Sequence, residues 1–173
     1  MLDGVFNHVG RDFPMFQTAL QEGPDSAAAQ WFRMTWPHSG DAEPEYDHFE
    51  GHRQLVTLNH ANEQVADFVV EVMCHWLERG ADAWRLDAAY AVPATFWSRV
   101  LPRVRERHPD AYFVGEVIHG DYVEYVAASG IDSVTQYELW KATWSALNDG
   151  NFHELDHALR RHDVFLESFV PQT

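Results

Sequence analysis

The sequence has a single cysteine, few basic residues and no long hydrophobic run. With only Cys74 available, the chain cannot form an internal disulfide or a thiolate zinc cluster, and the apolar helical pattern around Cys74 predicts a buried thiol. No apolar run approaches the ~20 residues that a membrane span needs. The first residues also lack the charged and apolar regions of a secretory signal. We therefore expect a cytoplasmic protein without a membrane partner.

Acidic residues outnumber basic residues by 27 to 12, which gives a net charge of −15 with neutral histidines. A surface of this sign repels polyanions, so we expect no nucleic-acid partner. Neutral substrates such as sugars meet no such penalty. The 173 residues, 46% hydrophobic and 14% aromatic, supply one substantial core and are too few for two independent ones.

Strand-like and helix-like patterns alternate along most of the chain after residue 60. Apolar residues at helical spacing predict helices over 61–79, 94–108, 121–129, 138–147 and 152–169. Short apolar or alternating runs predict strands over 81–89, 111–118 and 131–137. This order predicts an α/β fold with a parallel sheet, either doubly wound or closed into a barrel.

Residues 10–58 have a different texture, with little regular period and several proline and glycine turns. An irregular stretch of this length between two core elements is typical of a lid or a binding insertion. We therefore predict one domain over 1–173 that carries 10–58 as a short inserted loop domain.

Charged side chains stand at the ends of two predicted strands. Arg85 and Asp87 are two residues apart, so they point to the same face, whereas Trp84 and Leu86 point to the other. Glu116 ends the next strand, one strand–helix unit later. Because the carboxyl ends of parallel strands meet on one side, we expect Asp87 and Glu116 at the same mouth.

Two carboxylates at one mouth suit acid/base or nucleophilic chemistry on a glycosidic bond. A neighbouring Arg85 keeps Asp87 ionised, as a nucleophile requires. Apolar neighbours favour the protonated form of Glu116, as a general acid requires. Two plainer readings stay open from the residues alone, namely that Arg85 and Asp87 form only a buried ion pair and that Glu116 is a solvated charge.

A third strand is predicted at the start of the chain, where Asp3, Val5 and Asn7 share one face and His8 falls just past the strand. A histidine at such a position can bind a ligand or serve as a hydrogen-bonded structural residue. The position of His8 at a strand end, in register with the other two, favours the first role.

The segments at 3–8 (DGVFNH), 80–87 (GADAWRLD) and 115–117 (GEV) resemble three signature regions of the α-amylase family, glycoside hydrolase family 13. Residues 55–59 (LVTLN) resemble a further motif of that family, and all four occur in the family's order. The resemblance implies a partial (β/α)8 TIM barrel, covering about strands 3 to 6, with 10–58 as the inserted domain after strand 3.

The resemblance also implies roles for individual residues. Asp87 matches the nucleophile that forms the glycosyl-enzyme, Glu116 the acid/base, and Arg85 the group that holds the nucleophile. His8, Asn7 and Asp3 match the substrate-binding side of the site. The implied reaction is retaining hydrolysis or transfer at α-glucosidic linkages of an α-glucan or oligosaccharide.

The chain departs from the family pattern in two places. A Lys-His pair that serves calcium and substrate in many members is replaced by residues 88–92 (AAYAV). Asn7 matches a calcium position, so structural calcium stays open, although the chemistry itself requires no cofactor. We expect His119 to be a solvated loop residue. The family's fourth region, an Asn-His-Asp at the seventh strand, is missing, because the chain stops at 168–173.

We therefore expect an internal fragment of a catalytic barrel that alone is inactive or self-associates to hide its open edges. Two alternatives remain. One is a carbohydrate-binding or interaction module without turnover, and the other is a metal-dependent hydrolase that uses Asn7, His8, Asp87 and Glu116 as ligands. The sequence leaves open whether the reaction is hydrolysis or transglycosylation, and which α-glucoside is the substrate.

Overall fold

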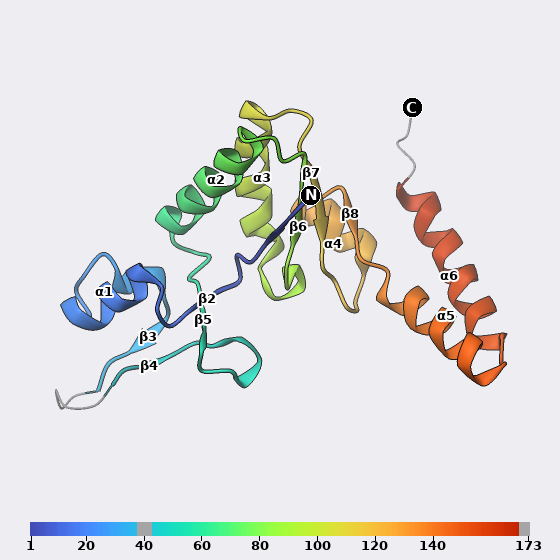
Figure 1. The fold of residues 1–173 in the computed structure, drawn as a ribbon, viewed down its shortest axis with the longest axis horizontal. Helices are drawn as coiled ribbons and strands as arrows, with labels where there is room; N and C mark the ends of the chain where they lie inside the picture. The colour runs from blue at the N-terminus through green and yellow to red at the C-terminus, as the bar shows by residue number, and fades with distance from the viewer. Residues whose placement is uncertain (38–42, 170–173) are drawn as a thin grey trace.

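The computed structural model describes residues 1–37 and 43–169, with side chains up to Asp163 in the last helix. The expectation about the chain end at 168–173 therefore lies largely outside the described residues, as does part of the inserted segment. Figure 1 shows the path of the chain, from its start in the central sheet out into a projecting excursion, back to the sheet and on to a helical hairpin.

The centre of the fold is a four-stranded parallel sheet. Its strands are β1 (Leu2–Gly4), β6 (Ala83–Leu86), β7 (Tyr112–Gly115) and β8 (Ser133–Val134), in the order β1-β6-β7-β8. The register pairs Asp3 with Arg85 and Leu86 with Gly115. The sheet confirms the prediction of an α/β fold with parallel strands, although each strand is shorter than its sequence pattern.

All five predicted helices are present. They are α2 (Glu63–Leu77), α3 (Ala94–Arg107), α4 (Tyr122–Ser129), α5 (Tyr137–Asp149) and α6 (His153–Phe169). The Asn62 side chain accepts the Gln64 N–H at 2.8 Å and so caps α2. Asp121 caps α4 in the same way, and α3 runs through Pro102 as one helix.

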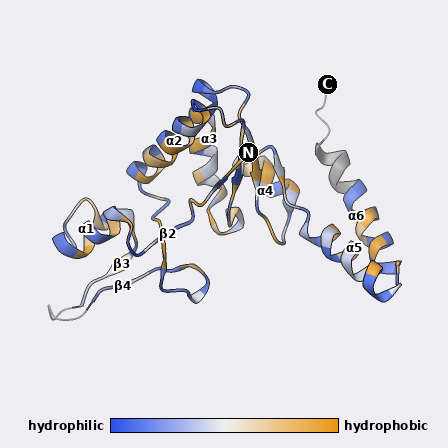
Figure 2. Ribbon diagram, in the orientation of Figure 1, coloured by the Kyte–Doolittle hydropathy of each residue, from blue (hydrophilic) through white to orange (hydrophobic). Residues whose placement is uncertain are grey.

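The main core lies between the sheet and the two helices α2 and α3, which pack against each other (Figure 1). Trp84, Leu86 and Phe113 from the strands are buried, as are Phe96 and Trp97 from α3. Cys74 is fully buried in α2, which confirms that prediction. Figure 2 shows hydrophobic residues on α2 and α4.

The inserted segment leaves and re-enters the domain through one small ladder. Its elements are β2 (His8–Gly10), α1 (Pro14–Glu22), η1 (Ala29–Trp31), β3 (Met34–Thr35), β4 (Glu45–Tyr46), η2 (Phe49–Gly51) and β5 (Leu55–Thr57). β2 pairs with β5, and β3 pairs with β4, both antiparallel. Phe16, Phe32 and Tyr46 of this segment pack edge to face and belong to the same hydrophobic cluster as Trp84 and Phe96.

The first predicted strand is corrected by the structure. It ends at Gly4, whose carbonyl accepts the Asp87 N–H at 3.0 Å, so the chain does not continue as a strand to Asn7. Phe6 instead turns inward against Trp84, with ring centroids 5.7 Å apart. His8 does not follow that strand but begins β2, in a separate sheet.

Helix α5 presents its large apolar side chains outward. Trp140, Trp144 and Leu147 are exposed, while Ala142 and Ala146 are buried. The apolar side of the helix predicted over 138–147 is therefore exposed to solvent within the described residues. The expectation of self-association stays a prediction. No helix within the described residues is both long and apolar enough to cross a membrane.

Candidate active site

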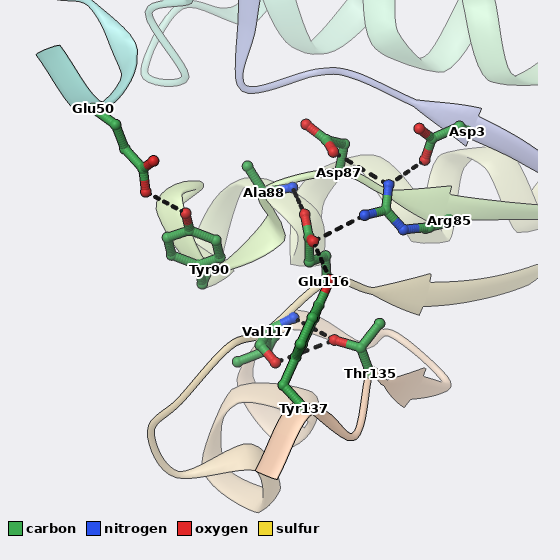
Figure 3. Close-up of polar contacts among 10 residues, drawn as sticks. All are labelled: Asp3, Glu50, Arg85, Asp87, Ala88, Tyr90, Glu116, Val117, Thr135 and Tyr137. Carbon is green, nitrogen blue, oxygen red and sulfur yellow. Dashed lines mark hydrogen bonds and ion pairs between the residues drawn. The ribbon is translucent and has the colours of Figure 1, made fainter. Parts of the chain in front are cut away.

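The guanidinium of Arg85 lies at the centre of the site and contacts three carboxylates (Figure 3). Its Nη1 lies 2.5 Å from Asp3 Oδ1 and 3.2 Å from Asp87 Oδ1, and its Nη2 lies 2.9 Å from Glu116 Oε1. The hydrogen bond to Asp3 and the neighbouring negative charges raise the pKa of Arg85 above its ordinary value. The arginine is thus a fixed positive charge among groups that would otherwise repel one another.

The local fold explains this convergence. Asp87 and Glu116 directly follow β6 and β7, which are adjacent and parallel. The Glu116 N–H donates to the Leu86 carbonyl at 2.9 Å and so extends the pairing by one residue. Trp84 and Leu86 are buried on the opposite face. The prediction that the two carboxylates reach one mouth is confirmed.

Glu116 is the more enclosed of the two carboxylates, with 14% of its side chain exposed against 26% for Asp87. Its Oε2 accepts the Ala88 N–H at 2.9 Å, and its Oε1 accepts the Tyr137 hydroxyl at 2.7 Å. Burial alone raises the pKa of Glu116, but these two hydrogen bonds and the Arg85 charge outweigh it, so the pKa lies below its ordinary value. The expectation that the apolar neighbours of Glu116 favour its protonated form is therefore wrong in the substrate-free chain, because polar donors surround the carboxylate.

The turn after Asp87 carries backbone strain. Ala88 has φ 46° and ψ 36°, a left-handed conformation that costs a non-glycine residue about 1–2 kcal/mol. This conformation directs its N–H at Glu116 and leads into η3 (Ala89–Ala91). The Tyr90 N–H then donates to the Glu116 carbonyl at 3.2 Å. The segments that follow β6 and β7 are thereby joined at the site.

The three N-terminal candidates lie in different surroundings. Asp3 is exposed and pairs with Arg85, so it lies in the carboxylate cluster. Asn7 is almost fully buried, and its Nδ2 lies 3.2 Å from His8 Nδ1. The His8 ring stacks on Phe49 with centroids 4.8 Å apart. Partial burial lowers the pKa of His8, and the nearby charge of Asp87 opposes that effect.

The inserted segment forms a wall beside the carboxylates. Glu50 of η2 accepts the Tyr90 hydroxyl at 2.6 Å (Figure 3), and Phe49 lies between His8 and Tyr90. Burial and the Glu50 carboxylate raise the pKa of Tyr90 to about 12, so it stays a neutral donor. His119 is exposed, as expected of a loop histidine, and its ring lies 6.4 Å from Tyr90.

The described residues include no cluster of acidic, histidine or cysteine side chains of the kind that commonly binds a metal ion. Within 1–37 and 43–169, no three His, Cys, Asp or Glu side chains gather in a geometry that could hold a metal ion. Asn7, the residue that matches a calcium position, contacts His8 through its amide nitrogen. The alternative that makes Asn7, His8, Asp87 and Glu116 metal ligands has no support in this geometry.

Sequence reasoning missed Tyr137, Tyr90, Glu50 and the contact between Asp3 and Arg85. Tyr137 stands at the end of the predicted strand 131–137, the position that singled out Asp87 and Glu116 on their strands. Its place at a strand end could therefore have marked Tyr137 as a candidate site residue. Glu50 carried no comparable signal, because an irregular insertion does not reveal where it folds back.

An arginine-held pair of carboxylates at the carboxyl edge of a parallel α/β sheet is the arrangement expected of a barrel glycosidase. Residues 1–164 match the model of the α-amylase catalytic domain. The chain belongs to the α-amylase family, and its fold is part of a (β/α)8 barrel, as predicted.

Several characterised relatives are similar to the chain. It is 35% identical over 141 residues to a cyclomaltodextrinase of Geobacillus thermopakistaniensis, covering 80% of the chain and 24% of the relative. It is 32% identical over 155 residues to neopullulanase 2 of Thermoactinomyces vulgaris, covering 88% of the chain and 26% of the relative. The chain therefore spans about a quarter of the length of these curated relatives.

A solved structure agrees with these matches. The maltose complex of cyclic α-maltosyl-(1→6)-maltose hydrolase from Arthrobacter globiformis superposes with a TM-score of 0.82 at 27% identity. The alignment covers 99% of the chain and 39% of that protein. The similarity extends over the whole described fold, including the excursion.

Proposed function

We propose that the protein carrying this chain is a retaining α-glucan hydrolase or transglycosylase, with Asp87 as nucleophile and Glu116 as acid/base. The observation that carries the proposal is the placement of both carboxylates at adjacent strand ends, bridged by one guanidinium. Retaining glycosidases need two carboxyl groups close together, one ionised and one able to exchange a proton. Membership of the α-amylase family supports the same chemistry.

In the first step, an Asp87 carboxylate oxygen attacks the anomeric carbon while Glu116 donates its proton to the departing glycosidic oxygen. The C–O bond to the leaving sugar breaks, and an ester to Asp87 forms. In the second step, Glu116 takes a proton from water or from a sugar hydroxyl, whose oxygen attacks the same carbon and releases Asp87. Arg85 contacts both carboxylates, so it holds their relative geometry and offsets their negative charge.

The substrate side of the site is proposed on the remaining candidates. His8 lies at the wall between Phe49 and the carboxylates and offers a ring nitrogen to a sugar hydroxyl. Asn7 orients His8 from behind, and Asp3 positions Arg85. The relatives' names, cyclomaltodextrinase and neopullulanase, support an α-glucan such as a cyclic maltodextrin or pullulan as substrate. We propose that the chemistry requires no metal and takes place in the cytoplasm.

The test uses the full protein with Asp87→Asn and Glu116→Gln, assayed on maltotriose and β-cyclodextrin. Each variant should lose at least about a thousand-fold in kcat, because a nucleophile or acid/base residue carries several kcal/mol of the barrier. Asp132→Asn is the matched control, since Asp132 is also a half-buried partner of an arginine but lies outside the site.

A second readout traps the intermediate. A glycosyl fluoride needs little acid assistance, so Glu116→Gln should accumulate a sugar ester on the peptide that contains Asp87, detectable by mass spectrometry. Full activity of Asp87→Asn would contradict the proposal. Oligosaccharide binding that survives Asp87→Asn, with no turnover by the wild type, would instead indicate a carbohydrate-binding module.

A further inference from the structure

Glu116 is held on both of its carboxylate oxygens, and one of the groups that hold it has no role in the proposed mechanism. Oε1 accepts the Tyr137 hydroxyl at 2.7 Å and also contacts Arg85 Nη2 at 2.9 Å. Oε2 accepts only the Ala88 N–H among the described residues, at 2.9 Å. Tyr137 is the first residue of α5, so this donor comes from a third strand–helix unit.

The position of Tyr137 is fixed by its own segment (Figure 3). Two residues earlier, the Thr135 N–H donates to the Gly115 carbonyl at 3.0 Å. The Thr135 hydroxyl accepts the Val117 N–H at 3.0 Å and donates to the Val117 carbonyl at 3.1 Å. These three bonds fasten the chain before Tyr137 to the residues on either side of Glu116. The hydrogen bonds of Thr135 therefore fix the backbone from which the Tyr137 side chain reaches Glu116.

We propose that Tyr137 is a positioning residue for Glu116: its hydroxyl occupies Oε1 together with Arg85, and thereby leaves Oε2 as the oxygen that carries the catalytic proton. The inference rests on the proposed role of Glu116 as acid/base. Oε1 already accepts two donors, so a proton added there would displace one of them. Oε2 has a lone pair available beside the Ala88 N–H. The tyrosine thus sets both which oxygen reacts and how readily it is protonated.

The sign of the effect follows from the bond. A donor to the ionised form lowers the pKa of Glu116, and the Tyr137 hydroxyl is one of the groups that do so. Removing it favours the protonated form. In a retaining mechanism the free enzyme needs Glu116 protonated, so the alkaline limb of kcat/KM reports this pKa. Tyr137→Phe should therefore move that limb to higher pH.

The experiment compares wild type, Tyr137→Phe and Tyr112→Phe in the full protein, with kcat/KM for maltotriose measured from pH 3 to 9, so that the range includes the region below 4.5 where the lowered pKa of Glu116 lies. Tyr137→Phe should shift the alkaline limb upward by about one pH unit, the size expected for one hydrogen bond to a charged group. Tyr112→Phe is the matched control, because its hydroxyl bonds Ser133 Oγ at 2.8 Å, outside the site. It should leave the profile unchanged.

A titration that needs no turnover accompanies the kinetics. Carbon-13 NMR of protein labelled at the glutamate carboxyls, with Glu116→Gln to assign the signal, measures the pKa of Glu116 directly. An unchanged pKa and alkaline limb in an active Tyr137→Phe enzyme would overturn the positioning role and leave the proposed function intact. A raised pKa in a protein whose wild type has no turnover would overturn the proposed function instead, and with it the catalytic part of this inference.

Discussion

Replacing Arg85 by Met should destabilise the fold far more than a single surface ion pair would suggest. The substitution keeps most of the aliphatic stem and removes the charge from between Asp3, Asp87 and Glu116. The Asp3 contact is largely exposed and is worth about 0.5 kcal/mol. The bonds to Asp87 and Glu116 are more enclosed and contribute about 1–2 kcal/mol each after allowance for solvent. The expected loss in free energy of unfolding is about 2.5–4.5 kcal/mol at pH 7, taking the three contributions together.

The loss should depend on pH. Arg85 is one of the groups that lower the pKa of Glu116. Stabilisation of this kind is fully present above the ordinary glutamate value of 4.5 and disappears as the pH falls through the lowered value. The penalty of Arg85→Met should therefore shrink between about pH 5 and pH 3. Adding Glu116→Gln to Arg85→Met should recover part of the loss at pH 7, because one uncompensated charge is removed.

Urea unfolding followed by tryptophan fluorescence measures these differences, because Trp84 and Trp97 are buried. Arg105→Met is the control. Arg105 is as exposed as Arg85, at 29% against 30% of the side chain, but it pairs with the single carboxylate of Asp132. It should cost about 1 kcal/mol or less. A loss for Arg85→Met no larger than this would refute the reasoning that one guanidinium offsets three charges.

Two further predictions concern the core. His60 is buried, donates from Nε2 to the Phe6 carbonyl at 3.0 Å, and has a pKa lowered by burial. The stability that neutral His60 gives the fold is therefore present above pH 6.5 and lost as the pH falls, so His60→Gln should flatten the decline in thermal stability between pH 7 and 5. An equally steep decline in the variant would contradict the role of His60 in it. Gly115→Ala should cost about 1–3 kcal/mol in urea unfolding, because its Cβ would lie 2.7 Å from Ile131 Cδ1 and 3.3 Å from Ala89 Cβ; a neutral effect would show that Ile131 moves aside freely.

The parts of the site that follow from local sequence could be predicted. A period of two places Arg85 and Asp87 on one face, and one strand–helix unit separates Asp87 from Glu116, so their meeting follows from the parallel sheet. The same period of two correctly predicted that Trp84 and Leu86 point to the opposite face, where both are buried. These residues depend on geometry that repeats along the chain.

The ionisation of Glu116 could not be predicted from its neighbours in sequence. Apolar flanking residues argued for the protonated form, but the deciding donors are a strained backbone N–H at Ala88 and the hydroxyl of Tyr137. Similarly, the contact between Asp3 and Arg85 joins positions 82 residues apart. Such groups meet only after the strands have paired, so composition around one residue does not describe its electrostatics.

The short ladder between β2 and β5 has a consequence for how the wall beside the carboxylates can vary. Since the inserted segment begins at β2 and ends at β5, which pair with each other, its two ends stay fixed whatever residues lie between them. Lengthening a tethered loop costs little additional closure entropy, because that cost grows only logarithmically. The loop tip that holds Phe49 and Glu50 against His8 and Tyr90 can thus differ in length and sequence without moving the β2–β5 ladder. The side chains of the tip can then change while the carboxylates keep their spacing.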